Sequence, residues 1–379
     1  GVQWLHISVE QTAQIVSEAQ RRYRTHNAAR RFVEEEFYST LALSSNESLD
    51  HRTVGDRLKG QMAIREALDW MWPVLTPSQL LNDVFGSHAL IRAADPKLSE
   101  EEVESLYKAR ESLSKEIRWS ASDAALLDEA RAVLGSRPGK REEDSIRTFG
   151  HIVVDEIQDL SPMDLRMLSR RSLNGSMTVV GDIAQATGAW AHDNWEGIIE
   201  ALSQKSGYRF SQLTVGYRLP QPTMDVANRL LRDTQFGFNP PVAVREMGDK
   251  PQFVSVETPA RLSATVVALV RSELEKLGPG YLAVIVPDAY LDIMSDSLNS
   301  SGIRHGLVDA GALEDQVTLV PVSLVKGLEV DVAVVVEPDK IITGEKNGLR
   351  ALYVALTRAT QRLTIVHTSP LPESLMSED

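Results

Sequence analysis

Residues 152–161 read IVVDEIQDLS, and this stretch is the most informative part of the chain. An apolar, β-branched run stops on two adjacent carboxylates, Asp155 and Glu156. Such runs form strands buried in parallel sheets, which present polar groups to ligands at the carboxyl ends of their strands. Ser161 and Pro162 have the preferences of a helix start. The stretch predicts a buried strand, a turn that carries two acids, and a helix; a solvated loop beside an ordinary strand is the alternative.

Composition limits the class of protein. Of the 379 residues, 42% are hydrophobic and 25% are charged, which is ordinary globular composition, and the length predicts two or three domains. The sequence contains no cysteine, which excludes disulfides and thiolate metal sites. It shows neither a membrane-length apolar run nor an opening signal segment, so we expect a cytoplasmic protein with no membrane partner.

The net charge of −13 indicates which kind of binding partner the chain favours. Residues 1–148 carry 20 basic and 24 acidic side chains, and residues 149–379 carry 20 and 29. Neither part resembles a basic nucleic-acid-binding body. The acidity favours a protein partner with a basic surface over tight, sequence-independent DNA binding.

The chain changes character near residue 149. The preceding part has helical patterns bounded by Ser, Thr, Asp, Pro or Gly, at 11–28, 56–71, 78–85, 99–117 and 122–134. The following part has strand patterns at 151–154, 177–180, 252–256, 281–286, 317–322, 332–336 and 363–367. Strands that alternate with helices predict an α/β fold with parallel sheets. The polar stretch 135–147 predicts a mobile linker, and the aromatic cluster 70–75 predicts a helical core, with a partner-binding wedge as the alternative.

Two polar turns follow in the α/β part. Gln185 comes after the strand that ends in Val-Gly-Asp, where it could hydrogen-bond a phosphate or an attacking water; a common Gly-Asp turn is the alternative. Gly216, Tyr217 and Arg218 follow a short apolar strand. Tyr217 could stack on a base, and Arg218 could hold a phosphate. Their alternative is a tyrosine packed on the sheet beside a solvated arginine.

Two further patterns lie near the C-terminus. In SLVKGLEVD (323–331), Lys326 offers positive charge, Gly327 permits close backbone approach and Glu329 can accept a hydroxyl hydrogen bond; a hairpin-like loop is the alternative. Residues 349–358 (LRALYVALTR) predict an amphipathic helix that ends at Arg358. This arginine could act as an arginine finger, or interact with its own helix dipole.

Together and in this order, the patterns resemble the superfamily 1 UvrD/Rep-type helicases over residues 149–379. VVDEIQD (153–159) resembles the Walker B motif, and VGDIAQ (180–185) the third motif. Residues 213–218 resemble the fourth motif, SLVKGLEVD the fifth and LYVALTRA (352–359) the sixth. The resemblance implies RecA-like P-loop NTPase motor domains, with parallel sheets flanked by helices, that bind ATP and Mg²⁺.

The same resemblance implies roles for individual residues. Asp155 would bind Mg²⁺, Glu156 would activate water and Gln185 would sense the γ-phosphate. Tyr217 would stack near the adenine, and Arg218 and Arg358 would clamp phosphate charge. The motif of Lys326, Gly327 and Glu329 would lie near the nucleotide or the domain interface. Phosphoryl transfer depends on such positioning and charge neutralisation.

One departure from the family is the missing phosphate cradle. No G-x-x-x-x-G-K-[ST] occurs in the sequence, and Gly135 to Lys140 has the wrong spacing. We expect the P-loop upstream of Gly1, in a longer protein; a degenerate motor is the alternative. The chain alone is then predicted to be inactive as an ATPase, and its first motor domain to lack a central strand.

A second departure is the position of the insertions. Arg218 and Lys326 are too close in sequence for the large helical insertion of true UvrD-type helicases, whereas residues 1–148 precede the Walker B strand. This arrangement is similar to the bacterial HelD proteins, RNA-polymerase-associated ATPases in which an insertion enters the main channel of the polymerase. The strings at 72–81 and 121–130 also resemble that family. The predicted domains are a helical insertion (1–148), the remainder of a first RecA-like domain (149–215) and a second RecA-like domain (216–379).

Three functions remain open at this point. The first is the motor portion of a HelD-like ATPase that binds core RNA polymerase through residues 1–148 and releases it from nucleic acid. The second is a UvrD/Rep-type DNA helicase or translocase, with Trp190 and Trp195 available to stack on DNA bases; core packing between the two domains is the alternative for both tryptophans. The third is a structural polymerase-binding module with a vestigial nucleotide site.

Overall fold

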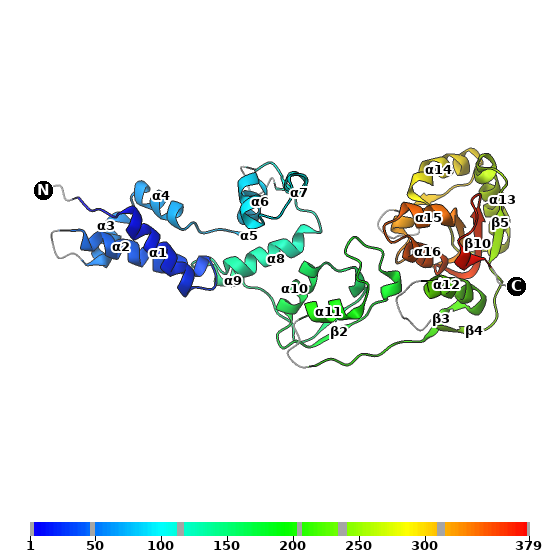
Figure 1. Ribbon diagram of the computed structural model, residues 1–379, viewed down its shortest axis with the longest axis horizontal. Helices are drawn as coiled ribbons and strands as arrows, with labels where there is room; N and C mark the ends of the chain where they lie inside the picture. The colour runs from blue at the N-terminus through cyan, green and yellow to red at the C-terminus, as the bar shows by residue number, and fades with distance from the viewer. Residues whose placement is uncertain are drawn as a thin grey trace. The chain divides into compact units, whose positions relative to one another are not determined.

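The computed structural model describes residues 4–45, 50–111, 117–202, 207–233, 241–308 and 315–376. By internal packing the chain divides into two compact units (Figure 1). Unit 1 comprises residues 1–151 and 163–176, and unit 2 comprises residues 152–162 and 177–379. The chain therefore passes between the units three times, and the turn that carries Asp155 and Glu156 belongs to unit 2.

Unit 1 is helical over most of its described residues. Its elements are α1 (Val9–Arg22), η1 (Asn27–Ala29), α2 (Arg30–Leu43), α3 (His51–Leu58), α4 (Met62–Met71), α5 (Pro77–Phe85), α6 (His88–Ala94), α7 (Glu100–Leu106), α8 (Asp123–Leu134), α9 (Arg141–Asp144) and, from its second residue, α10 (Pro162–Arg171). The helices α1, α5 and α7 begin with capping boxes on Ser8, Thr76 and Ser99, which satisfy the first backbone N–H groups. Local capping thus sets several of the boundaries that the sequence predicts.

The last two long helices of unit 1 are joined by ion pairs. Asp128 on α8 is 5% exposed, and Arg170 and Arg171 on α10 both donate hydrogen bonds to its carboxylate. Arg170 also pairs with Glu129, and Arg166 Nη2 lies 2.8 Å from Glu129 Oε1. Because one partner carboxylate is buried, these contacts hold α10 in a fixed position on α8.

Several predictions for residues 1–148 are wrong in detail. The helix expected at 56–71 is interrupted around Gly60, a poor helix former, and becomes α3 and α4. The helix expected at 99–117 ends at Leu106, and residues 112–116 lie outside the described part. The helices α2 and α6 were not predicted. The aromatic cluster divides: Trp72 is buried at 6% exposure, whereas Trp70 is 88% exposed, so the core prediction holds for one tryptophan only.

Unit 2 contains a parallel sheet of six strands in its described residues, in the order β5-β10-β9-β6-β8-β7. Its strands are β5 (Gln252–Ser255), β6 (Leu282–Val286), β7 (Gly306–Leu307), β8 (Val317–Pro321), β9 (Val330–Val336) and β10 (Ala359–His367). Each strand except the edge strand β7 overlaps a predicted one. Every residue of β6 and β8 is buried, because helices cover both faces of the sheet.

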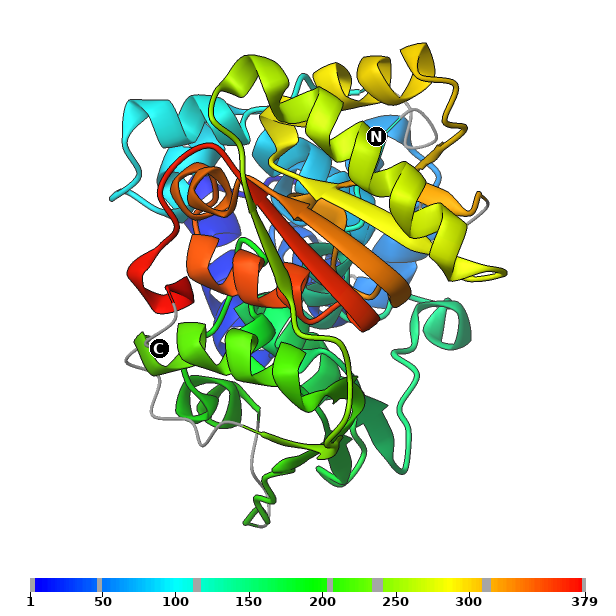
Figure 2. The ribbon, with the colours of Figure 1, turned by 90° about the vertical axis from the view of Figure 1, so that its right-hand side faces the viewer.

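The two faces of this sheet carry separate cores. Alternate residues of β6 and β9, such as Ala283 and Val335, pack with α12 (Gln221–Asp233), α15 (Pro338–Gly344) and α16 (Gly348–Leu356). The residues between them, such as Val284, pack with α13 (Pro259–Leu277) and α14 (Leu291–Ser300). Figure 2 shows helices on both faces of the strands. The α/β prediction, with a parallel sheet flanked by helices, is confirmed; that residues 1–148 are an insertion, and the three domain boundaries, stay predictions.

Two smaller parallel pairs precede this sheet. The strands β1 (Ile152–Val154) and β2 (Met177–Val179) pair residue by residue, and β3 (Val215–Pro220) pairs with β4 (Val242–Arg245). The prediction that residues 152–154 are buried is wrong for Val153, which is 71% exposed. The reason is that, among the described residues, only β2 pairs with β1 and the face that carries Val153 is uncovered.

The remaining elements of unit 2 are short connections and one helix. They are η2 (Ile157–Asp159), η3 (Ile183–Gln185), α11 (Trp195–Ala201), η4 (Asp288–Tyr290), η5 (Val322–Leu324) and η6 (Glu373–Leu375). The loop between β8 and β9 is not hairpin-like, because β6 lies between these two parallel strands. None of the described helices combines the length and the apolar character needed to cross a membrane.

Candidate functional site

The turn after β1 holds Glu156 in an unusual backbone conformation. Glu156 has φ 52° and ψ 37°, in the left-handed region that residues other than glycine rarely adopt. Its N–H donates a hydrogen bond of 2.9 Å to the Asp155 carboxylate. The local consequence is that the two adjacent acids project from a tight turn, and such strain is common at functional sites.

Gln158 is the internal support of this turn. Its side chain is fully buried, its Nε2 donates to the Glu156 carboxylate, and its Oε1 accepts a 3.0 Å hydrogen bond from the N–H of Asp182. Gly181 makes room for this amide, because a Cβ at that position would lie 2.4 Å from Gln158 Oε1. Gln158 therefore fixes the carboxylate of Glu156 relative to the turn after β2.

Lys326 reaches this turn from the loop between β8 and β9. Its Nζ lies 3.1 Å from Glu156 Oε2, donates to the Asp159 carboxylate, and donates a 3.1 Å hydrogen bond to the carbonyl of Gln185. The Lys326 side chain is 19% exposed. A partly buried ammonium thus neutralises charge beside the predicted catalytic base.

Arg358 is joined to the same network through Gln185. Its guanidinium donates to the carbonyls of Val354 and Leu328 and, at 3.0 Å, to Gln185 Oε1. Gln185 Nε2 in turn donates a 2.7 Å hydrogen bond to Asp182. Arg358 hydrogen-bonds the last turn of α16, as an interaction with its own helix end would require. It also contacts Gln185 in the turn after β2, as a reach toward the predicted site would require.

The helix before Arg358 differs from the prediction. It ends at Leu356, and every residue of α16 is buried except Leu349, which is partly buried. The amphipathic prediction is therefore wrong, because the helix packs between the sheet and neighbouring segments. Arg358 itself is 3% exposed.

Arg218 lies on β3 and contacts the same segments. Its Nη1 lies 2.6 Å from Glu329 Oε1, and its Nη2 donates a 3.5 Å hydrogen bond to the carbonyl of Thr357. Arg218 is thus ion-paired with Glu329, and the alternative of a solvated arginine is wrong. Tyr217 is 75% exposed, which contradicts packing on the sheet and leaves its ring free to stack.

The electrostatics follow from this geometry. Burial would raise the pKa of the Glu156 carboxyl, but hydrogen bonds from Gln158 and Lys326 and the charges of Lys326 and Arg358 outweigh it, so that this pKa lies below its ordinary value. Burial, followed by repulsion from Arg218, lowers the pKa of the Arg358 guanidinium to about 10. At neutral pH the Glu156 carboxylate is therefore ionised, and it lies among cationic side chains.

The predicted site residues therefore gather within unit 2. Glu156, Gln185, Lys326 and Arg358 are joined by direct hydrogen bonds and ion pairs, and Arg218 joins Glu329 beside them. Asp155 is tied to the turn by its neighbour. Gly327 has φ 80°, which its lack of a side chain allows, and Tyr217 is exposed on β3.

Three residues of the network were not predicted: Gln158, Asp159 and Asp182. Gln158 and Asp159 lie inside the quoted DEIQD string, so the signal was present. The sequence does not reveal which residues they contact, because partners such as Asp159 and Lys326 lie 167 residues apart.

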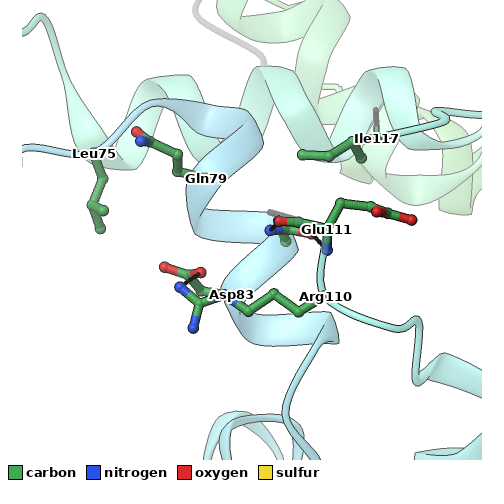
Figure 3. A pocket seen from close by; sticks show the side chains of 7 residues that line it. Leu75, Gln79, Asp83, Arg110, Glu111 and Ile117 are labelled. Carbon is green, nitrogen blue, oxygen red and sulfur yellow. Dashed lines mark hydrogen bonds and ion pairs between the residues drawn. The ribbon is translucent and has the colours of Figure 1, made fainter. Parts of the chain in front are cut away.

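The structure also has a polar hollow in unit 1, unconnected with the predicted residues. It lies beside α5 and is lined by Leu75, Gln79, Asn82, Asp83, Arg110, Glu111 and Ile117. Asp83 and Arg110 point toward each other (Figure 3), and their side chains lie 2.5 Å apart. Asn82 forms two hydrogen bonds with the backbone of Glu111. Asp83 and Arg110, and Asn82 and the backbone of Glu111, are thus one another's ion-pair and hydrogen-bond partners.

Two comparisons with known proteins found similarities, one in sequence and one in structure. Residues 316–366 match the family model of the UvrD-like helicase C-terminal domain. The matched range is similar to that domain, and it contains Lys326, Glu329 and Arg358. A solved structure, the C-terminal domain of a possible DNA helicase from Lactobacillus plantarum WCFS1, is similar with 22% sequence identity and a TM-score of 0.34, over 42% of this chain and 92% of that chain. No curated protein matches the sequence.

Proposed function

We propose that this chain is the motor portion of a UvrD-type, helicase-like ATPase. The observation that carries the proposal is the joint contact of Lys326 with Glu156 and of Arg358 with Gln185. Residues from inside and outside the matched C-terminal domain thereby converge. An acid, an amide and several cations in one network suit the positioning and charge neutralisation of phosphoryl transfer.

Each residue has a role in this proposal. Glu156, ionised at neutral pH, orients and deprotonates the attacking water. Gln185 accepts or donates a hydrogen bond at the terminal phosphate, while Arg218, Arg358 and Lys326 face the developing negative charge. Tyr217 offers its exposed ring to the adenine.

The residues present fit Mg²⁺ held mainly by phosphates. Among the described residues no group of three or more carboxylates or histidines could hold a metal alone. Mg²⁺ commonly binds through one or two carboxylates together with substrate phosphates and water. Asp155 supplies one such carboxylate at the end of β1, and bound Mg²⁺ would neutralise charge on the triphosphate.

We further propose that the full-length protein is HelD-like and uses residues 1–148 to engage core RNA polymerase and release it from nucleic acid. The support is the acidic net charge and the helical unit that precedes the Walker B strand. In this proposal ATP acts as a switch whose closure repositions the helical unit.

The test is enzymology of the full-length protein. We expect ATP hydrolysis that does not need DNA, co-elution with core polymerase, and a Glu156→Gln variant that binds nucleotide while turnover falls at least roughly a hundredfold. Turnover that survives this substitution would show that Glu156 is not the base. A protein that fails to bind polymerase, and whose ATPase is strongly stimulated by DNA, would exclude the polymerase role.

A UvrD/Rep-type DNA translocase is the second candidate, and the exposure of Trp190 favours it. Trp190 follows the third motif and is 61% exposed, so the core-packing alternative is wrong for this residue. Trp195 packs edge-on against Phe210 with ring centroids 5.7 Å apart. An exposed indole can stack on a base of single-stranded DNA.

A gel shift with single-stranded DNA separates the two candidates. The translocase predicts salt-sensitive binding that Trp190→Ala abolishes. The matched control is Trp70→Ala, an exposed tryptophan of unit 1. Equal binding by the two variants would remove the stacking role of Trp190.

A further inference from the structure

The strands beside Arg218 and Arg358 are both irregular. Between the pairs Gly216–Ala243 and Pro220–Arg245, β3 has three residues where β4 has one. Arg218 lies within this bulge. Bulges leave backbone groups outside the regular ladder and often occur next to active sites, where they redirect a side chain.

A second bulge lies just after Arg358. Between the pairs Ala359–Val330 and Arg362–Val332, β10 has two residues where β9 has one, and Thr360 is the first of them. Arg358 therefore lies between the end of α16 and an irregular strand start. The backbone direction at Arg358 therefore depends on the contacts that hold the bulge in β10.

One side chain bridges both bulges. Arg245, the last residue of β4, donates through Nη1 a 2.9 Å hydrogen bond to the carbonyl of Arg218 and a 2.8 Å hydrogen bond to the carbonyl of Thr360. A guanidinium is suited to this task because it is planar and always charged, and charged donors form stronger hydrogen bonds than neutral ones. Segments that are distant in sequence are thereby held at a fixed separation.

We propose that Arg245 is a positioning residue that sets the relative placement of Arg218 and Arg358. This inference rests on the proposed ATPase function. Arg245 contacts the main chain of both segments and neither arginine side chain, so it acts through backbone geometry. A second hydrogen bond between the segments, from Arg218 to the carbonyl of Thr357, is 3.5 Å long and therefore weak.

The test compares three variants of the full-length protein. Arg245→Ala removes both hydrogen bonds, and Arg245→Lys keeps a charge without the planar fork. The control Arg261→Ala removes an exposed arginine of α13 that pairs with Glu257, a residue just before that helix. Because Arg245 is exposed, its replacement should lower the melting temperature by only a few degrees.

The first readout is hydrogen–deuterium exchange of peptides that cover residues 215–220 and 357–362. We expect faster exchange in both segments of Arg245→Ala and in neither segment of Arg261→Ala. The second readout is steady-state ATPase, where kcat should fall about tenfold with a smaller change in KM, because misplaced arginines lose contacts that matter most in the transition state. Arg245→Lys should recover part of the rate.

Two outcomes overturn the proposal: exchange that stays at the wild-type level in either segment, or faster exchange with an unchanged kcat. A wild-type protein with no ATPase activity would refute the proposed function instead. In that case the exchange comparison still decides whether Arg245 braces the two bulges.

Discussion

Lys326 Nζ lies 3.1 Å from Glu156 Oε2, so the predicted base of the site is held by a cation from a loop that the sequence places far away. Lys326 also contacts Asp159 and the backbone of Gln185. One ammonium thus organises the turn after β1 and the turn after β2, and it provides a direct means of changing the pKa of Glu156.

Replacing Lys326 with Met should shift the pH dependence of ATP hydrolysis. In the wild type the pKa of Glu156 is lowered, so the base stays ionised down to acid pH. Without Lys326 the burial that raises this pKa is less opposed, and the acid limb of the kcat/KM profile should move to higher pH. The control is Lys340→Met, which removes a half-exposed lysine paired with Asp339. An acid limb that stays in place would contradict the assignment of Glu156.

Gly181→Ala should damage catalysis without touching a charged group. The added Cβ would lie 2.4 Å from Gln158 Oε1 and 3.0 Å from Ile157 Cγ2, so the buried amide must move. Because Gln158 holds Glu156, we expect kcat to fall roughly tenfold or more, and stability to fall by about 1–3 kcal/mol through overpacking. Gly150→Ala, where a Cβ meets no atom within 4 Å, is the matched control. Equal activity of the two variants would show that the position of Gln158 does not matter.

Arg358→Lys should not be a conservative change. The guanidinium donates to Val354, Leu328 and Gln185 from a position that is 3% exposed, and an ammonium cannot reproduce this fork. We expect turnover to fall by about 10³-fold, the magnitude that the proposed arginine-finger role implies, and the free energy of unfolding to fall by roughly 1–3 kcal/mol because buried carbonyls lose donors. Urea unfolding and ATPase assays measure the two effects. Near-normal turnover of the lysine variant would show that charge alone suffices at this position.

Asp144 of unit 1 should make stability pH-dependent. Hydrogen bonds from Arg137 lower its pKa from 3.8 to about 2. The stabilisation is therefore complete above pH 3.8 and is lost as the pH falls toward about 2. We expect Asp144→Asn to lose about 1 kcal/mol at neutral pH, a figure reduced for solvent screening, and to show a flatter acid dependence of the urea midpoint. The control is Glu143→Gln, since Glu143 lies 3.9 Å from the same arginine. Identical acid dependence in Asp144→Asn and the wild type would contradict the linkage.

The strands of the large sheet were predictable because they are continuous runs of branched apolar residues. The run predicted at 332–336 reads VAVVV, and it forms the fully buried part of β9. For β3 only a short apolar strand before Gly216 was predicted, and β4 was not predicted, because β3 contains Gly216 and Pro220 and β4 spans only four residues. Hydrophobic periodicity and strand propensity identify a strand that is covered on both faces of a sheet, but they carry little information about a short, exposed pair of strands.

The candidate site was predictable as a set of residues and not as a network. Each of Glu156, Gln185 and Arg358 stands in a recognisable motif, whereas their contacts join segments up to 173 residues apart. Asp159 had a place in the motif but no assigned partner. Arg245 had no sequence signal at all, because its task is set by two bulges that only the folded backbone reveals.

The route of the chain between the units has a mechanical consequence. The carboxylate turn of unit 2 is followed directly by α10, whose Arg170 and Arg171 are anchored to Asp128 of unit 1. Any rotation of one unit against the other must be absorbed by backbone torsions at three junctions, after residues 151, 162 and 176. The segment that bears Glu156, residues 152–162, lies between two of these junctions, so a change in backbone torsion at either junction bears directly on it.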